Sequence, residues 1–258
     1  MSTSRFGPVV TTALAMFLAW TIATWLFEGR IETLLRPGAL TDRLIYALGV
    51  NLLLGVVGTL YLLRWLRKRH GSPSASRGGF GRPVRTVAWT LSGLVLGLAA
   101  YVGQGSPSTH LGVVTNAFSQ VFVVSVAEVL VCWSLVGTTL EAALASSLGR
   151  ASVFVAALAA AVLFGLYHFA HSAPFNTWAM VGLLSAVGLV TGLFFFVSRD
   201  ALGTAVFHNF LGTFGVTQAL QKAGSLETLE VLQPPLVGTA LATAVVLLVG
   251  YWWVRRPD

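Results

Sequence analysis

Cysteine and charged residues are scarce in this chain. Only one of its 258 residues is a cysteine, Cys132, which excludes an intramolecular disulfide and a cysteine-rich metal site. Charged residues make up 10% of the sequence, against about 25% in an ordinary soluble domain. Hydrophobic residues make up 55%, and the 27 glycines and 8 tryptophans are typical of membrane helices and their interfacial belts. The composition predicts an integral membrane protein.

Two sequence patterns are also missing. No HExxH motif occurs, which excludes a zincin-type metal helix. We find no internal repeat and no pair of matched interrupted helices, the features that mark many transporters. An ion or proton transporter is therefore a weaker alternative for this chain than an enzyme.

Apolar segments long enough to cross a bilayer, about 20 residues each, recur along the whole chain. They predict an all-α fold, a polytopic integral membrane helical bundle of about eight transmembrane helices that forms a single domain over residues 1–258. The seventh segment is the least apolar, because it is rich in Gly and Thr and carries His208 and Asn209. The segments span residues 8–27, 44–63, 86–104, 113–139, 152–171, 177–198, 201–220 and 235–254.

The net charge of +7 is concentrated between the second and third segments, where residues 64–85 are strongly basic. The positive-inside rule places this loop and both termini in the cytoplasm of a multi-pass cell-membrane protein, leaving Arg30, Arg36, Arg43 and Lys222 outside. The basic residues thus predict topology and contact with lipid headgroups, and no nucleic-acid partner. Residues 71–83 are expected to form a flexible loop, and residues 28–43 a short interfacial piece along the outer surface.

Three ionisable residues lie in three separate apolar segments: Glu128, His168 and His208. Such groups are costly in a bilayer, about 2.5–3.5 kcal/mol for a central acid, so they usually face one another or a water-filled cavity. Counted from the turn near Gly149, Glu128 and His168 differ in depth by only about 3 Å at 1.5 Å per residue. These two residues are therefore expected to pair on antiparallel helices.

His208 is harder to place, because it is only about 12 Å from the turn near Arg199 along its helix. Either the region 138–152 projects beyond the membrane, or the seventh helix is tilted or set inward. Small residues in the seventh segment would let that helix pack closely enough to bring His208 to Glu128. These are Gly203, Thr204, Gly212 and Gly215.

A glutamate and two histidines in a water-accessible membrane cavity suit amide hydrolysis. The carboxylate can take a proton from water, and the imidazoles can stabilise the oxyanion. The same three residues could instead hold zinc or another divalent metal, since His, His and Glu form a catalytic-zinc ligand set. The sequence leaves both alternatives open.

Simpler interpretations exist for each residue. Glu128 could be a buried acid with a purely structural role. His168 could be a histidine near the membrane surface whose hydrogen bonds are all made within the protein. His171 follows His168 on the same face, but the segment ends there, so we expect it near the surface. Other polar or aromatic residues are expected to pack or bridge helices, or to lie in loops without a role: Asn51, Gln120, Cys132, Trp133, His70 and His110.

The order of these residues resembles the CPBP family, which comprises CAAX prenyl proteases and bacteriocin-processing or self-immunity proteins and is also called Abi. Its members carry EExxxR, FxxxH and HxxxN motifs on successive helices of an eight-helix bundle. Phe164 to His168 match FxxxH, while Glu128 and His208 supply one residue each of the other two motifs. The resemblance covers about residues 115–218, which would be the catalytic core.

The sequence departs from the family at several positions. Ala127 and Val129 flank Glu128, so the paired glutamates are reduced to one. Cys132 or Trp133 stands where the arginine is expected. Gly212 replaces the asparagine, although Asn209 adjoins His208.

The resemblance implies an intramembrane endopeptidase that hydrolyses a peptide bond of a membrane-proximal peptide or protein substrate. Glu128 would be the general base, with His168 and His208 orienting water and stabilising the oxyanion. Asn209 would be a supporting donor, and a metal would be optional. The alternative is a catalytically silent member that acts as an immunity or scaffold membrane protein.

Overall fold

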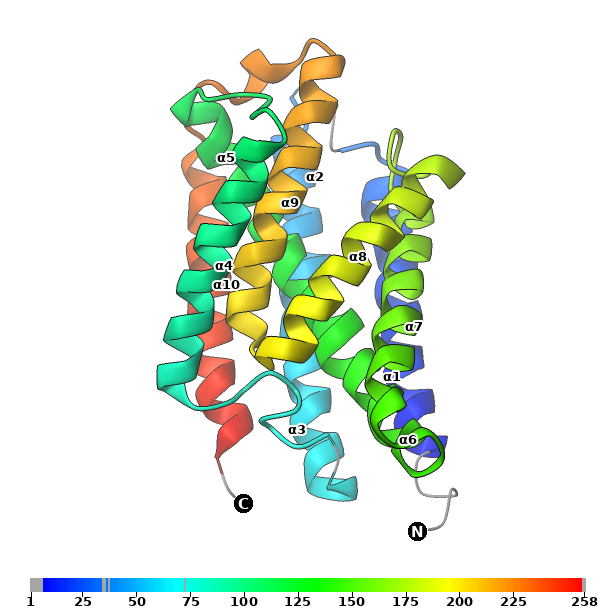
Figure 1. Ribbon diagram of the computed structural model, residues 1–258. Helices are drawn as coiled ribbons and strands as arrows, with labels where there is room; N and C mark the ends of the chain where they lie inside the picture. Colours follow the sequence, from blue (N-terminus) through cyan, green and yellow to red (C-terminus); the bar gives the residue numbers. More distant parts are fainter. Residues whose placement is uncertain (1–6, 34–35, 37, 72, 257–258) are drawn as a thin grey trace.

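The computed structural model describes residues 7–33, 36, 38–71 and 73–256. The first half of the chain contains α1 (Gly7–Thr24), η2 (Trp25–Gly29), α2 (Leu40–Ile45), η3 (Tyr46–Gly58), α3 (Thr59–His70), α4 (Pro83–Gly103), α5 (Leu111–Glu128) and η4 (Val129–Gly137). The second half contains α6 (Thr138–Leu148), η5 (Gly149–Ala151), α7 (Ser152–Tyr167), η6 (His168–Ala170), α8 (Trp178–Ser198), α9 (Ala201–Lys222), η7 (Leu226–Leu229) and α10 (Pro234–Arg255). The described chain is helical and forms one bundle (Figure 1).

All eight predicted segments are helical. Six helical stretches are long and apolar enough to cross a membrane, which indicates a multi-pass membrane protein. They are Gly7–Gly29, Leu40–His70, Pro83–Gly103, Leu111–Ala170, Trp178–Ser198 and Pro234–Arg255. The fourth stretch contains two predicted segments and reverses at η5. α9 is not among the six, so the number of eight crossings stays a prediction.

Both ends of the described chain lie at the same end of the bundle, as the topology prediction requires (Figure 1). The end of α3 and the turns at 149–151 and 199–200 point the same way. Of the described basic residues, all except Arg30, Arg36, Arg43 and Lys222 belong to segments at this end. The two ends therefore differ strongly in positive charge.

Small residues let the helices approach closely where α9 packs on α4. A Cβ added to Gly93 would lie 2.3 Å from the carbonyl oxygen of Gly203, and one added to Gly203 would lie 2.6 Å from the backbone of Trp89. α7 and α8 pack in the same way, because a Cβ on Gly188 would lie 2.7 Å from the Phe164 ring. Such contacts take the place of a hydrophobic driving force, which is absent between helices in lipid.

The loop after α3, expected to be flexible, packs against the bundle. Phe80 is buried, and the Gly79 carbonyl accepts a hydrogen bond from Ala201 N at 2.9 Å. Gly79 has φ +95°, a conformation that favours glycine. The hydroxyl of Ser134 also donates to the carbonyl of Gly78. These contacts hold residues 78–80 against η4 and the beginning of α9, whereas Ser76 and Arg77 are exposed, so flexibility stays a prediction for the rest of the loop.

The turn between α8 and α9 is fixed by Asp200, whose side chain caps α9 by accepting from Gly203 N at 2.7 Å. The hydroxyl of Thr86 on α4 donates to the same carboxylate at 2.6 Å. Burial raises the pKa of the Asp200 carboxyl above its usual value, although both hydrogen bonds oppose the shift. Arg199 is held beside the turn by two hydrogen bonds to Glu141 on α6, at 2.6 and 2.7 Å.

Candidate functional site

A cavity of about 380 Å³ lies among the helices, and its wall contains three of the four predicted site residues, Glu128, His168 and His208, but not Asn209. α8 and α9 meet near their shared turn and diverge towards the opposite end (Figure 1). The cavity lies where they diverge, between the first half of α8 and the second half of α9, with α5 and α7 behind it. Its α8 and α9 lining is mostly apolar: Met180, Leu183, Leu184, Val187, Leu211 and Phe214.

Glu128, the last residue of α5, is 5% exposed, and its two carboxylate oxygens have different neighbours. Oε2 lies 2.9 Å from Nε2 of His208 on α9. The other ring nitrogen of His208, Nδ1, lies 2.9 Å from the hydroxyl of Thr191 on α8. An ionised carboxylate can only accept, so Nε2 donates to Glu128 and Nδ1 accepts from Thr191. His208 is therefore fully hydrogen-bonded.

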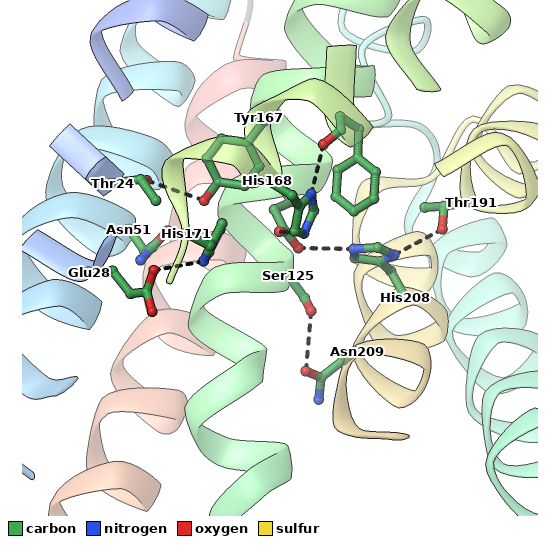
Figure 2. Close-up of polar contacts among 12 residues, drawn as sticks. Thr24, Glu28, Asn51, Ser125, Tyr167, His168, His171, Thr191, His208 and Asn209 are labelled. Carbon is green, nitrogen blue, oxygen red and sulfur yellow. Dashed lines mark hydrogen bonds and ion pairs between the residues drawn. The ribbon is translucent and has the colours of Figure 1, made fainter. Parts of the chain in front are cut away.

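The second oxygen of Glu128 faces His168, whose Nε2 lies 3.9 Å from Oε1. Nδ1 of His168 lies 2.8 Å from the backbone carbonyl oxygen of Phe164, one turn earlier. A carbonyl can only accept, so the proton is on Nδ1 and the lone pair of Nε2 points towards Glu128. The two imidazoles therefore approach different oxygens of the carboxylate. Both rings lie in the centre of the polar contacts drawn in Figure 2.

The aromatic residue of the FxxxH match has a direct role in this arrangement. The Phe164 ring packs edge-on against His168 and His208, with centroid distances of 4.7 and 5.2 Å. Trp133 packs against His208 at 5.5 Å, which confirms its expected packing role. Phe164 thus separates the two histidines and supplies the carbonyl that fixes one of them.

The predicted depth mismatch of His208 is resolved by α6. The Glu141–Arg199 pair places the α8–α9 turn level with the beginning of α6, so the rest of α6 and η5 project beyond it (Figure 1). Counted from this pair, the depth difference between Glu128 and His208 is about 6 Å at 1.5 Å per residue. The wider turns of η4, which advance less per residue, reduce it further. The extension of α6 past the α8–α9 turn is in the direction that the first of the two sequence alternatives requires, and its position relative to the membrane stays a prediction.

His171 is not near the surface, as the sequence suggested. Its side chain is 10% exposed, and Nδ1 lies 3.2 Å from Oε2 of Glu28. Glu28, which the sequence placed on the outer surface, is 2% exposed and also accepts from Ser172 N at 2.8 Å and Ser172 Oγ at 2.5 Å. Both sequence expectations were wrong, because the chain after His168 folds back onto η2 instead of leaving the bundle.

His171 completes a group of possible ligands. Glu128, His168 and His171 each offer one ligand atom, and these atoms all lie within 4.8 Å of one another. All three residues are buried. This group could hold a metal ion, and it differs from the set of Glu128, His168 and His208 that the sequence suggested.

Asn209 is buried beside the site, but its side-chain amide is hydrogen-bonded to residues other than Glu128. Its Nδ2 donates to the backbone carbonyl of Phe118 at 3.1 Å, and its Oδ1 accepts from Ser125 Oγ at 3.3 Å. Both partners belong to α5. Asn209 therefore joins α9 to α5 next to His208, as Figure 2 shows.

The glycines near His208 divide into two kinds. A Cβ on Gly212 would lie 2.7 Å from Val121 on α5, which confirms the expected close approach. A Cβ on Gly215 would meet nothing within 4 Å, so this residue lines the cavity and contributes no helix contact. Close packing of α9 on α5 at Gly212 is what brings His208 within reach of Glu128.

Three π-helical segments adjoin the site, and no sequence pattern predicted them. Glu28 lies in η2, η3 begins at Tyr46, and η4 follows Glu128 directly. π-Helical turns occur frequently at functional sites. The hydroxyl of Tyr167, the residue before His168, lies 3.2 Å from the hydroxyls of both Thr24 and Tyr46. These contacts hold the end of α7 against α1 and η3.

Comparison of the chain with protein-family models, with curated proteins and with solved structures finds no match. The resemblance to the CPBP family thus rests on the residues themselves.

Two further residues of the site, Glu28 and His171, have sequence features that indicate a role. Glu28 is an acid at the end of an apolar segment, and His171 lies three residues after His168, the spacing of one helical face. Thr191 and Ser125 carry no comparable signal, because hydroxyl residues are common in membrane helices.

Proposed function

We propose that this protein is a membrane-embedded endopeptidase of the CPBP type, with Glu128 as the general base. The observation that carries the proposal is the position of the Glu128 carboxylate in the cavity wall, 2.9 Å from one histidine and 3.9 Å from another. The packing of Phe164 against both histidines supports the resemblance, because it gives the aromatic residue of the FxxxH motif a physical purpose.

The gap between Glu128 and His168 suits a reactive water. Oε1 and Nε2 are both acceptors, and a water that donates to two acceptors at about 2.8 Å holds them roughly 4–4.5 Å apart. The measured separation of 3.9 Å is close to this value. A water in this position would be oriented by His168 and would have Glu128 within proton-transfer distance.

Hydrolysis then proceeds without a covalent enzyme intermediate. Glu128 takes one proton from the water while the water oxygen attacks the carbonyl carbon of the peptide bond. Protonation of the carboxylate weakens it as an acceptor, which frees the Nε2–H of His208 to stabilise the oxyanion. Glu128 returns its proton to the amide nitrogen, the C–N bond breaks, and a carboxylate and an amine terminus leave.

The shape of the cavity supports a peptide substrate that approaches from the membrane. The cavity lies between the diverging halves of α8 and α9, where the lining is mostly apolar, and its wall reaches Gln104, Gln218 and Lys222 at one end. This end is opposite the basic one. With both termini cytoplasmic, as the positive-inside rule favours, the site would receive a membrane-proximal peptide from the non-cytoplasmic side.

The proposal is tested by comparing the termini of membrane and exported proteins in three strains. A deletion strain is complemented with the wild-type protein, Glu128→Gln or the matched control Glu227→Gln, whose residue is exposed outside the cavity. We expect new termini with the wild type and the control, and a loss of about 100-fold or more with Glu128→Gln. Identical termini in all three strains, with the deletion phenotype restored, would instead identify a silent immunity or scaffold protein.

The orientation has its own test. A reporter fused after Asp258 or inserted near Ser74 should report the cytoplasm, and one inserted within residues 28–33 should report the outside. The opposite result would reverse the side from which substrate enters without changing the chemistry.

A further inference from the structure

We propose that Glu128, His168 and His171 bind one divalent transition-metal ion of the zinc type, with Glu28 as the residue that positions His171. This inference concerns the same residues as the endopeptidase site proposed above and rests on that proposal: a bound ion would take the lone pairs of Glu128 and His168 that otherwise hold the reactive water, so the ion-bound and water-bound sites are alternative states. It can fail independently, because metal binding is measured without a substrate. The ligand set is two imidazoles and one carboxylate, a combination that catalytic zinc sites use with a water in the fourth position.

The first argument is the direction of the lone pairs. His168 donates from Nδ1 to the Phe164 carbonyl, and His171 is held through Nδ1 by Glu28, so each histidine has Nε2 left for a ligand. Metal-ligating histidines almost always use their second nitrogen in this way, on a carbonyl or a carboxylate. Both orienting partners are already in place.

The second argument is an unsatisfied atom. The side chain of His171 is only 10% exposed, and its Nε2 atom is buried without a hydrogen-bond partner. Leaving such a group unpaired costs about 1–3 kcal/mol. The rings of His168 and His171 are nearly parallel, with centroids 5.0 Å apart and an interplanar angle of 21°. A shared cation would satisfy His171 and explain why two imidazoles lie side by side.

The third argument is the distance between ligand atoms. Those of Glu128, His168 and His171 lie within 4.8 Å of one another. Ligands bound to zinc at about 2.0–2.2 Å in a tetrahedral arrangement lie roughly 3.5 Å apart. The side chains would therefore move inward by about 1 Å, and the cavity beside them leaves room for the remaining ligand position. His208 stays outside the set and holds the far oxygen of Glu128.

The experiment measures zinc bound to the full-length protein in detergent micelles, purified with a tag that contains no histidine. The protein is stripped with a chelator, reloaded with Zn²⁺, washed and analysed for metal. Co²⁺ is loaded in parallel, because its visible spectrum reports the coordination geometry. We expect about one equivalent in the wild type and loss of this site in His168→Ala and His171→Ala.

Matched variants separate the alternatives. His70→Ala and His110→Ala remove histidines far from the cluster and should leave the zinc content unchanged. His208→Ala should keep the zinc, whereas Glu28→Gln should weaken its binding by 10–100-fold. If His171→Ala aggregates on size exclusion, His171→Phe keeps the ring volume without a ligand atom.

The proposal is overturned if the wild type retains no more zinc than a His168→Ala/His171→Ala double variant. It is also overturned if His208→Ala loses the metal while His171→Ala keeps it. Peptide cleavage by a protein that binds no zinc would overturn this inference alone. Zinc binding by a protein that cleaves no peptide, with or without the metal, would leave it intact and overturn the proposed function alone.

Discussion

The two oxygens of Glu128 face two different environments. On one side, His208 is 2.9 Å away and is itself held by Thr191, so both of its ring nitrogens have a partner. On the other side, His168 is 3.9 Å away, and Nε2 of His171 has no partner. We call these the closed side and the open side. We infer that the closed side stabilises the carboxylate, whereas the open side has free acceptors where a water, a substrate or a cation can bind.

The comparison predicts that the closed side matters more for stability. His208→Ala should lower the free energy of unfolding by about 3 kcal/mol or more, because it leaves a buried carboxylate without its partner. Titration of the micellar protein with a denaturing detergent, followed by circular dichroism, measures this change. A loss below about 1 kcal/mol, the value of an ordinary hydrogen bond, would mean that His208 does not hold Glu128.

Gly212→Leu tests how the closed side is brought together. A Cβ at this position would lie 2.7 Å from Val121, so the larger side chain must push α9 away from α5. We expect a loss of about 1–3 kcal/mol in unfolding free energy and cleavage reduced almost as much as by removal of His208. Gly238→Leu on α10 is the control, because a Cβ there meets nothing within 4 Å. Equal effects of the two substitutions would contradict the close approach.

His168→Ala tests the open side. The substitution removes one hydrogen bond and the ring contacts with Phe164, Tyr167 and His171, together about 2 kcal/mol or more, and it leaves Oε1 of Glu128 exposed to the cavity. Cleavage should nevertheless fall about 100-fold or more, because the reactive water loses its orientation. His110→Ala, on an exposed residue, controls for general effects. Normal cleavage by His168→Ala would remove this histidine from the mechanism.

Thr191→Val should have the smallest effect. It replaces a hydroxyl by a methyl group of the same shape and leaves Nδ1 of His208 without a donor, which costs about 1 kcal/mol. The Nε2–H of His208 still donates to Glu128, so the tautomer is kept, but the ring loses the contact that orients it from α8, and cleavage should change more than the stability does. An unchanged rate of cleavage would show that Thr191 does not position His208.

The sequence predicted most of the architecture, because long apolar segments have few folded alternatives in a bilayer. It did not predict how the connections pack. Phe80 is a single apolar residue in a loop rich in glycine and serine, and its burial depends on the turn at Arg199. The projection of α6 beyond that turn is likewise a property of the Glu141–Arg199 pair, which joins residues far apart in the chain.

The prediction of the site was limited in the same way, by contacts that the connections make. Counting along antiparallel helices correctly paired Glu128 with His168, since both positions are measured from one turn. The method failed for His171, because the chain bends into a 3₁₀ turn after Tyr167 and returns to η2, where Glu28 lies. Local periodicity carries no information about such a return, so the pairing of Glu28 with His171 came only from the structure.

The most direct test of the closed and open sides is a pair of double-mutant cycles on the unfolding free energy. One cycle combines Glu128→Ala with His208→Ala, and the other combines Glu128→Ala with His168→Ala. The account predicts a coupling of about 1.5 kcal/mol or more for the first pair and less than about 0.5 kcal/mol for the second, the limit for independent sites. Equal couplings, or a larger one for His168, would contradict it.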